Sequence, residues 1–140
     1  MLNQLSVFLE NKPGTLEAMT RILADHKIDI RALSLAETKD FGIARLIVDD
    51  AFSAAGVLKD ADYVASITQV LAFEVPDTPG GLSQLLSHFG EAGVNVEYMY
   101  SSLGKDATAA YMIFRVHHTE KSEGLLKAKG LKAIDDASVL

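Results

Sequence analysis

Apolar side chains recur along the chain with two different periods, and the switches between these periods predict its elements. Leu5 and Val7 alternate with polar neighbours, which is typical of a strand with one buried face. Leu16, Met19 and Leu23 recur at the spacing of an amphipathic helix. The same patterns predict strands at residues 4–9, 28–37, 42–48, 94–103, 109–117 and 131–134. They predict helices at residues 15–26, about 50–60, about 82–92 and 119–129.

Two further features complete this assignment. The β-prone stretch at residues 63–75 is divided between two strands, which brings the expected total to eight. Turns are expected at Lys39-Asp40 and at Gly104-Lys105-Asp106, where polar residues and glycine separate two β-prone runs.

One block of residues occurs twice, and its copies are Asn11-Lys12-Pro13-Gly14-Thr15-Leu16 and Asp77-Thr78-Pro79-Gly80-Gly81-Leu82. The second copy follows the first by 66 positions, and the same spacing relates Leu23 to Phe89. A repeat at fixed spacing indicates a duplicated unit. We therefore expect two units, residues 1–69 and 70–140, each with the ferredoxin-like order βαββαβ. The expected fold class is α+β, with antiparallel sheets that carry their helices on one face.

Composition excludes several classes of function. The formal net charge is −6, it is shared evenly by the two halves, and no Lys/Arg cluster is present to neutralise nucleic-acid phosphates. The chain has no cysteine, and therefore no disulfide framework or thiolate nucleophile. It lacks a signal-peptide pattern and an apolar run of the ~20 residues that a membrane span needs. We expect a soluble cytoplasmic protein without nucleic-acid or membrane partners.

The repeated Pro-Gly turn can hold a small anion. It leads from a strand directly into a helix, whose first backbone N–H groups have no partner within the helix and favour negative charge. Gly14 and Gly80 carry no Cβ, so a ligand can approach the backbone closely. Asn11 and Asp77 stand just before the turns, where Asp77 would prefer a cation such as an α-ammonium. An anion and an ammonium at one place describe a free amino acid, although a Pro-Gly turn is also ordinary turn chemistry.

The repeated block, the helix after it and the segments at residues 27–30 and 93–96 together resemble the ACT domain. ACT domains are regulatory βαββαβ units that bind amino acids. The resemblance covers both copies, and the whole chain is similar to small stand-alone bacterial proteins made only of two ACT units. Residues 97–101 strengthen that likeness.

The resemblance implies an arrangement and a set of ligand-binding residues. Second strands at the sheet edges would join the units into one eight-stranded sheet, with a ligand between the turn of one unit and the second strand of the other. One implied site consists of Asn11, Pro13, Gly14, Thr15 and Leu16 with Asn95 and Val96. The other consists of Asp77, Pro79, Gly80, Gly81 and Leu82 with Asp29 and Ile30.

The second of these implied sites contains both departures from the family pattern. Asp29 and Asp77 stand where Asn is frequent, and two carboxylates there would repel a bound carboxylate unless an ammonium or protonation offsets the charge. We therefore expect the site of Asn11 and Asn95 to bind an amino acid better.

The sheet face away from the helices is unusually apolar in the expected strands. Its third-strand positions are Ile43, Arg45, Ile47, Tyr111, Ile113 and Arg115. A face washed by solvent should be more polar, so we expect it to be covered, most simply by a second chain in a homodimer. A two-layer monomer with scattered exposed apolar residues is the alternative.

The function that these observations favour is a non-catalytic sensor that binds a free amino acid between its two units and acts on a partner protein or on its own oligomeric state. One alternative is an assembly module without a ligand. Another is a small enzyme on a ferredoxin-like fold, but no paired base and nucleophile can be proposed. His117-His118 does not indicate a metal site, because neighbours on a strand point to opposite faces. No cofactor is expected.

Overall fold

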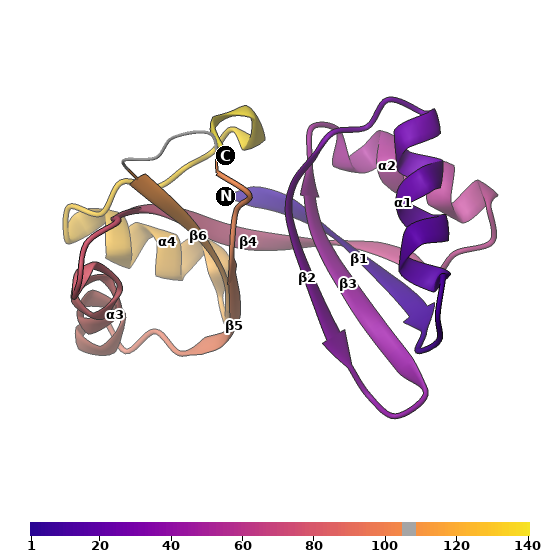
Figure 1. Ribbon diagram of the computed structural model, residues 1–140. Helices are drawn as coiled ribbons and strands as arrows, with labels where there is room; N and C mark the ends of the chain where they lie inside the picture. Colours follow the sequence, from indigo (N-terminus) through magenta and orange to yellow (C-terminus); the bar gives the residue numbers. More distant parts are fainter. Residues whose placement is uncertain (105–108) are drawn as a thin grey trace. The chain divides into compact units, whose positions relative to one another are not determined.

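The computed structural model describes residues 1–104 and 109–140. It divides the chain into two compact units (Figure 1). The N-terminal unit comprises Asn3–Thr68, and the C-terminal unit comprises Met1–Leu2 together with Gln69–Leu140. Lys105 and Asp106, in the second expected turn, lie outside the described residues. No helix in the described part of the chain combines the length and the apolarity that crossing a membrane requires.

The N-terminal unit follows the expected order of elements. It contains β1 (Leu2–Glu10), α1 (Thr15–Asp25), β2 (Ile30–Glu37), β3 (Phe41–Val48), α2 (Ala51–Asp60) and the start of β4 (Ala65–Pro76). The central strand β3 pairs antiparallel with β1 and with β2, so that Leu46 lies opposite both Leu5 and Leu33. The chain just before β4 lies beside β1, where the Phe8 N–H donates to the Val64 carbonyl at 3.0 Å. The strand order is therefore β2-β3-β1-β4.

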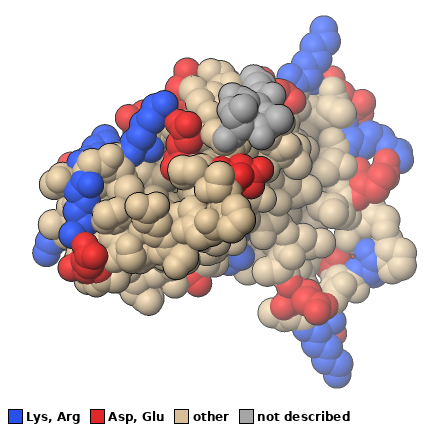
Figure 2. Space-filling model, turned by 60° about the vertical axis from the view of Figure 1, so that its left-hand side comes forward, with Lys and Arg blue, Asp and Glu red and all other residues tan. Residues whose placement is uncertain are grey.

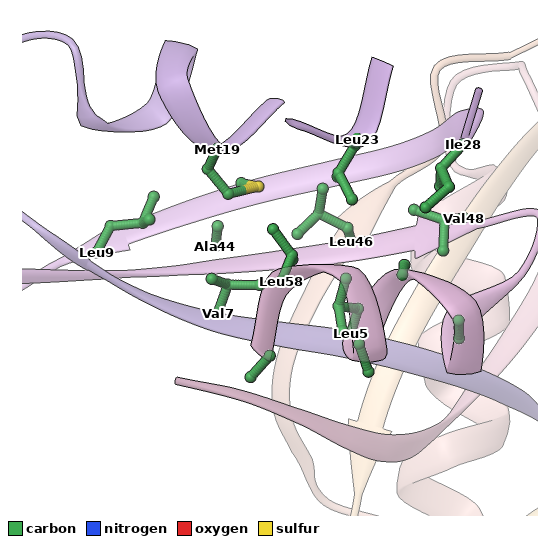
Figure 3. Close-up of a cluster of buried hydrophobic side chains, with 14 residues drawn as sticks. Leu5, Val7, Leu9, Met19, Leu23, Ile28, Ala44, Leu46, Val48 and Leu58 are labelled. Atoms are coloured by element: carbon green, nitrogen blue, oxygen red, sulfur yellow. The ribbon is translucent and has the colours of Figure 1, made fainter. Parts of the chain in front are cut away.

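The core of this unit lies between its sheet and its two helices (Figure 3). Alternate residues of β1 and β3 supply one side of it, and α1 and α2 supply the other. Burial of these side chains is the main stabilising term. Its largest fully buried members are Leu5, Met19, Leu23, Leu46 and Leu58.

The C-terminal unit repeats the arrangement with β4, α3 (Gly81–Glu91), β5 (Val96–Ser101), β6 (Ala109–Val116) and α4 (Thr119–Ala128). Strand β6 pairs antiparallel with β4 and with β5. Its core contains three aromatic rings, in which the centroid of Phe89 lies 5.9 Å from Phe73 and 4.7 Å from Phe114. Such edge-to-face and tilted pairs add specificity to a core that would otherwise be aliphatic.

The α+β class is confirmed, but the structure describes six strands rather than the expected eight. Within the stretch at residues 63–75, residues 65–75 belong to a single strand, β4, because no Gly or Pro interrupts them before Pro76. The expected closing strand at residues 131–134 is reduced to one bridge, between Phe73 and Ala133, and one hydrogen bond from the Ile134 N–H to the Ala72 carbonyl at 2.8 Å. Strands β2 and β5 are each the edge strand of their own unit, as expected.

The sheet faces opposite the helices are partly covered. Ile47 and Ile113, which stand on these faces, have no exposed area, whereas the other four positions, Ile43, Arg45, Tyr111 and Arg115, are half-buried. A homodimer through this face stays a prediction. Phe8, on the same face as Ile43, is 49% exposed.

The last residues are ordered. A short 3-10 helix, η1 (Ala137–Val139), follows Asp136, whose carboxylate accepts the Ser138 N–H at 2.9 Å. The amino-terminal ammonium of Met1 contacts the carboxylates of Glu123 at 2.7 Å and Asp135 at 2.5 Å. Asp135 and Asp136 therefore both have partners within the chain.

Candidate functional site

The two Pro-Gly turns have the same backbone geometry. Gly14 has φ 86° and ψ −11°, and Gly80 has φ 87° and ψ −8°. Both residues are in the left-handed region, which glycine adopts without the steric cost that a Cβ brings. Each glycine is the N-cap of the helix that follows, α1 or α3, and neither cap makes a side-chain hydrogen bond. No side chain caps either helix, and the first amide of each donates to the backbone of its turn instead. The Thr15 N–H donates to the Lys12 carbonyl at 3.5 Å, and the Gly81 N–H donates to the Thr78 carbonyl at 3.0 Å.

Hydrogen bonds around the turns repeat at the same spacing of 66 residues. The Lys12 N–H donates to the Glu10 carbonyl at 3.0 Å, and the Thr78 N–H donates to the Pro76 carbonyl at 2.8 Å. The carbonyls of Gly14 and Gly80 each accept the first helical hydrogen bond, at 3.0 Å. The duplication has thus preserved a turn in detail.

The turns differ at the first residue of the helix. Thr15 in the first copy uses its hydroxyl to donate to the Glu10 carbonyl at 2.8 Å. Gly81 stands in the same position of the second copy, and a Cβ added there would lie 2.3 Å from the Pro76 carbonyl oxygen. The second turn has therefore closed onto its strand so tightly that only glycine fits.

A cavity of about 510 Å³ adjoins the first turn. Its volume lies within the range of small-molecule sites, ~300–1,000 Å³. Apolar side chains from β1, α1 and β2 line it, together with Gly14, Thr15 and a rim of polar groups. The apolar lining residues are Leu9, Leu16, Leu33 and Leu35, and the polar side chains include Asn11, Glu17, Thr20 and Glu37.

A second cavity, of about 580 Å³, reaches the other side of the same turn and contacts Pro13, Gly14 and Thr15. Phe8, Phe41, Tyr63 and Val64 line it, together with Lys12. The structure therefore brings all five predicted residues of the first turn to one place, next to two cavities.

The side chain of Asn11 is already engaged on one side. Its Nδ2 donates to the carbonyl of Thr38 at 3.1 Å, and its backbone N–H donates to the carbonyl of Asp40 at 3.0 Å. These bonds tie the turn to the hairpin between β2 and β3. The side-chain oxygen of Asn11, Oδ1, is the group that remains for a ligand, and it is an acceptor suited to an ammonium.

Most charges around the first cavity are paired. Glu10 contacts Lys12 at 2.7 Å, and Glu17 contacts Arg21 at 2.5 Å. A hydrogen bond and the nearby charge of Glu17 hold the pKa of Arg21 above its usual value. These pairs reduce the repulsion that a ligand carboxylate would otherwise meet from the two glutamates.

Asp29 and Ile30 stand at the start of β2. Asp29 is not an isolated negative charge, because its carboxylate contacts the Arg31 guanidinium at 2.8 Å. Its N–H donates to the Asp49 carboxylate at 3.0 Å. The carboxylate of Asp29 therefore has a cationic partner within its own unit.

Asn95 and Val96 hold the equivalent place in the C-terminal unit. Asn95 is exposed and lines a cavity of about 260 Å³, and Val96 pairs with Val116 at the start of β5. Both β2 and β5 carry a register shift at their start, across Arg31 and across Glu97. Such bulges redirect side chains, and Glu97 here contacts His117 at 2.9 Å and Arg115 at 3.4 Å.

Asp77, Pro79, Gly80, Gly81 and Leu82 lie together at the second turn. Leu35 in the lining of the first cavity corresponds to Ser101 at the spacing of 66 residues, so the C-terminal unit carries a less apolar second strand at this point. The pairing of each turn with the second strand of the other unit stays a prediction.

The sequence interpretation missed the part of the lining that comes from β2. Leu33, Leu35 and Glu37 share one face of this strand, and Glu17 and Thr20 share one face of α1. Their period-2 and period-3 spacings were available signals. What could not be read from them was that these faces meet at the turn.

The described residues, which omit 105–108, contain no group of His, Cys, Asp or Glu arranged to hold a metal ion. On the face shown in Figure 2, Lys and Arg side chains are interspersed with Asp and Glu. That face therefore carries no continuous basic surface of the kind that phosphate backbones require.

Comparison with known proteins identifies the family. The chain is similar to protein BT0572 from Bacteroides thetaiotaomicron, with 38% identity, a TM-score of 0.91, and coverage of 99% of this chain and 96% of that one. It shares its fold with the ligand-free regulatory subunit of aspartate kinase from Thermus thermophilus, with 16% identity, a TM-score of 0.70, and coverage of 91% and 90%.

The regulatory subunit of aspartate kinase from Thermus flavus has the same fold at 15% identity and a TM-score of 0.63, with coverage of 90% and 88%. No curated protein matches the chain. A family model described as ACT domain pair matches residues 1–140, which confirms the resemblance seen in the repeated blocks. The chain therefore belongs to the family of ACT domain pairs.

Proposed function

We propose that this ACT domain pair is a regulatory, non-catalytic protein that binds a free amino acid at the Pro13-Gly14 turn. The observation that carries the proposal is the cavity of about 510 Å³ that adjoins this turn and combines an apolar lining with the start of α1. The family resemblance adds Asn95 and Val96 to the site, and the proposal includes them.

Each part of the ligand has a partner of suitable chemistry. The carboxylate accepts hydrogen bonds from the N–H groups that follow Thr15 at the start of α1, where the helix dipole has its positive end. The Thr15 N–H itself already donates to the Lys12 carbonyl at 3.5 Å. The ammonium is held by the carbonyl oxygen of Asn11, whose Nδ2 is engaged by Thr38. The side chain packs against Leu16, Leu33 and Leu35, so we propose that the preferred amino acid is apolar.

The second turn is proposed to bind more weakly. Gly81 allows that turn to close onto Pro76, and Ser101 stands where the first copy has Leu35. Asp77 adds a negative charge next to the place where the ligand carboxylate would lie. The carboxylate of Asp29 is paired with Arg31, so the proposed difference between the sites rests mainly on the closed turn and the lost apolar contact.

The ligand would act by linkage. An amino acid that contacts the protein in one arrangement more strongly than in another shifts the equilibrium by that difference in affinity. Two proteins of similar fold are named as regulatory subunits of aspartate kinase, which supports a regulatory role here. The output is proposed to pass to a protein partner or to a change in self-association.

A thermal-shift screen of the twenty common amino acids, followed by titration calorimetry, tests the proposal. Ligand at a hundred times its dissociation constant adds about 2.7 kcal/mol to stability, which such a screen detects. We expect apolar amino acids to bind at one dominant site per chain. A flat response to all twenty would favour a ligand-free assembly module, and two equal sites would contradict the difference between the turns.

A matched pair of variants locates the site. Leu35→Ser removes an apolar contact from the cavity at a side chain that is already 52% exposed, and we expect affinity to fall about tenfold. Leu103→Ser makes the same kind of change at a residue that is 69% exposed in the C-terminal unit, and it should leave affinity unchanged. Equal effects of the two changes would place the ligand elsewhere.

A further inference from the structure

Gly42 is a glycine inside a strand whose backbone does not need one. It lies in β3, it is buried, and it is not in the left-handed region. Glycine in the interior of a strand is destabilising and supplies no side chain for packing. It often marks a place where a ligand approaches the backbone closely. The reason for the glycine must therefore lie in its surroundings.

The bare backbone of Gly42 forms part of the cavity of about 510 Å³ beside the first turn. Gly42 lies opposite Leu9 of β1 and Glu37 of β2, and all three residues line this cavity. Ala44 and Leu46 follow at period 2, and their side chains belong to the core between the sheet and the helices (Figure 3). A side chain at residue 42 would point to the same side of the sheet, and so into the cavity.

The fold has room for a methyl group at this position. A Cβ added at Gly42 would lie 3.3 Å from Cδ1 of Leu35 and 3.5 Å from the Ala36 carbonyl oxygen. Leu35 is 52% exposed, so its side chain can move by the few tenths of an ångström that the shorter contact requires. A methyl group here is therefore compatible with the fold, but it occupies space that the cavity now offers.

The second copy of the unit carries this methyl group. Leu9 corresponds to Val75 at the spacing of 66 residues, and Val75 lies opposite Ala110 of β6. Ala110 thus holds the register position that Gly42 holds in the first copy. The third strand of the unit accepts alanine there, so pairing within the sheet does not require glycine. The methyl group is missing in the copy whose turn is proposed to bind the ligand.

We propose that Gly42 is a specificity-determining residue of the amino-acid site. The apolar side chain of the ligand lies against the bare backbone of Gly42, and the missing methyl group gives the site room for a long aliphatic side chain. This inference rests on the proposed function and narrows its ligand class from apolar amino acids in general to those with long aliphatic side chains. Leu16 and Leu35 supply the apolar walls on either side.

Titration calorimetry of the full chain with a homologous series of unbranched amino acids tests the proposal. The series runs from alanine through 2-aminobutyrate and norvaline to norleucine, so that each member adds one methylene. Affinity for the unmodified chain should rise about fourfold with each methylene. In Gly42→Ala the rise should stop before norleucine, and the preference for norleucine over alanine should fall about tenfold or more.

Two further variants serve as controls. Gly56→Ala makes the same change in α2 of the same unit, where a Cβ would meet nothing within 4 Å, and it should leave the preference unchanged. Leu35→Ala removes the side chain that the new methyl group would press. Adding Gly42→Ala to Leu35→Ala should still lower the preference for norleucine, because the methyl group itself fills the space. Thermal unfolding establishes that each variant is folded.

The outcomes separate this inference from the proposed function. If Gly42→Ala keeps the preference of the unmodified chain, or weakens all four ligands equally, the inference is wrong and the amino-acid site remains. A loss of preference that disappears in the Leu35→Ala background would assign the selection to Leu35 and also overturn the inference. If no member of the series binds the unmodified chain, both the inference and the proposed binding of apolar amino acids fail.

Discussion

Thr15 and Gly81 occupy the same position in the two copies of the Pro-Gly turn, and they meet the strand before them in different ways. The Thr15 hydroxyl donates to the Glu10 carbonyl at 2.8 Å, whereas any Cβ on residue 81 would lie 2.3 Å from the equivalent Pro76 carbonyl oxygen. One copy therefore has room for a side chain where the other has none. This single difference distinguishes the first turn, which has space beside the start of its helix, from the second turn, which packs directly against its strand.

Gly81→Ala should destabilise the C-terminal unit. The added methyl collides with backbone that cannot move away cheaply, so we expect a loss of about 1–3 kcal/mol in the free energy of unfolding. Gly90→Ala in the same helix, α3, is the control, because its Cβ would meet nothing within 4 Å. That change should stabilise by about 0.5–1 kcal/mol. Urea denaturation measures both values, and equal effects would contradict the closed turn.

Asn11→Ala should loosen the hairpin between β2 and β3. It removes the hydrogen bond from Nδ2 to the Thr38 carbonyl, and we expect a cost of about 1 kcal/mol. Hydrogen exchange should become faster at the Phe41 amide, which faces the Thr38 hydroxyl across the hairpin. Lys39→Ala is the control, since it keeps the carbonyl that Asn11 contacts. Unchanged exchange in Asn11→Ala would mean that the bond does not hold the hairpin.

Phe114→Ala should strongly destabilise the C-terminal unit. Phe114 is fully buried and lies against Phe73 and Phe89, and truncation of such a residue costs about 3–5 kcal/mol. Phe41→Ser, at a side chain that is 56% exposed, should change stability by no more than about 0.5 kcal/mol. Denaturant titration compares the two, and a small effect of Phe114→Ala would show that the aromatic cluster is not a major source of stability.

Glu91 should contribute to the acid sensitivity of the fold. The hydrogen bond from Lys129 at 3.0 Å, with its charge, lowers the pKa of the Glu91 carboxyl below its usual value. A depressed pKa in the folded state gives stability that is present above the unfolded pKa and is lost as pH falls through the folded value. Glu91→Gln should therefore flatten part of the acid limb of a plot of unfolding free energy against pH.

The control for that measurement is Lys129→Met. In this background Glu91→Gln should change the acid limb much less, because the hydrogen bond and the charge that contribute most to the lowered pKa are absent and only the smaller effect of His88 remains. A change of the same size in both backgrounds would assign the effect to another group.

Much of the fold could be predicted because the chain carries its strongest signals twice. The turns at Gly14 and Gly80 and the helices after them start where the repeated block places them, at Thr15 and at Gly81. Pro-Gly before an apolar helical stripe is a local signal, determined by residues within one or two turns of each other.

The errors in the strands have a physical cause. Strand pairing depends on partners far away in sequence, so the number of residues that pair cannot be read from a local pattern. The segment at residues 131–134 has an apolar pattern but forms only one bridge, with Phe73. The division of this stretch into two strands was wrong, because alternation of side chains does not show where one strand ends and the next begins.

The candidate site was predicted only in part for a similar reason. Asn11, Gly14 and Leu16 could be found because they belong to one short motif. Leu33 and Leu35 reach the same cavity from another strand. The contact of Asp29 with Arg31 spans only two residues. It lies at the register shift at the start of β2, and no local sequence pattern predicts that shift.

Strand β4 belongs to both units, and this limits the insertions and deletions that the chain can accept. Ala65 and Ile67 pack into the N-terminal core, and Leu71, Phe73 and Val75 pack into the C-terminal one, all on odd positions of a single strand. Inserting one residue after Thr68 would reverse the sides of the residues beyond it. Leu71, Phe73 and Val75 would turn away from the C-terminal core, and Val70, Ala72 and Glu74 would turn towards it. A boundary between repeats is normally where insertions and deletions are tolerated. In this chain the boundary lies within a continuous strand, so an insertion or deletion there would disrupt the packing of the C-terminal core.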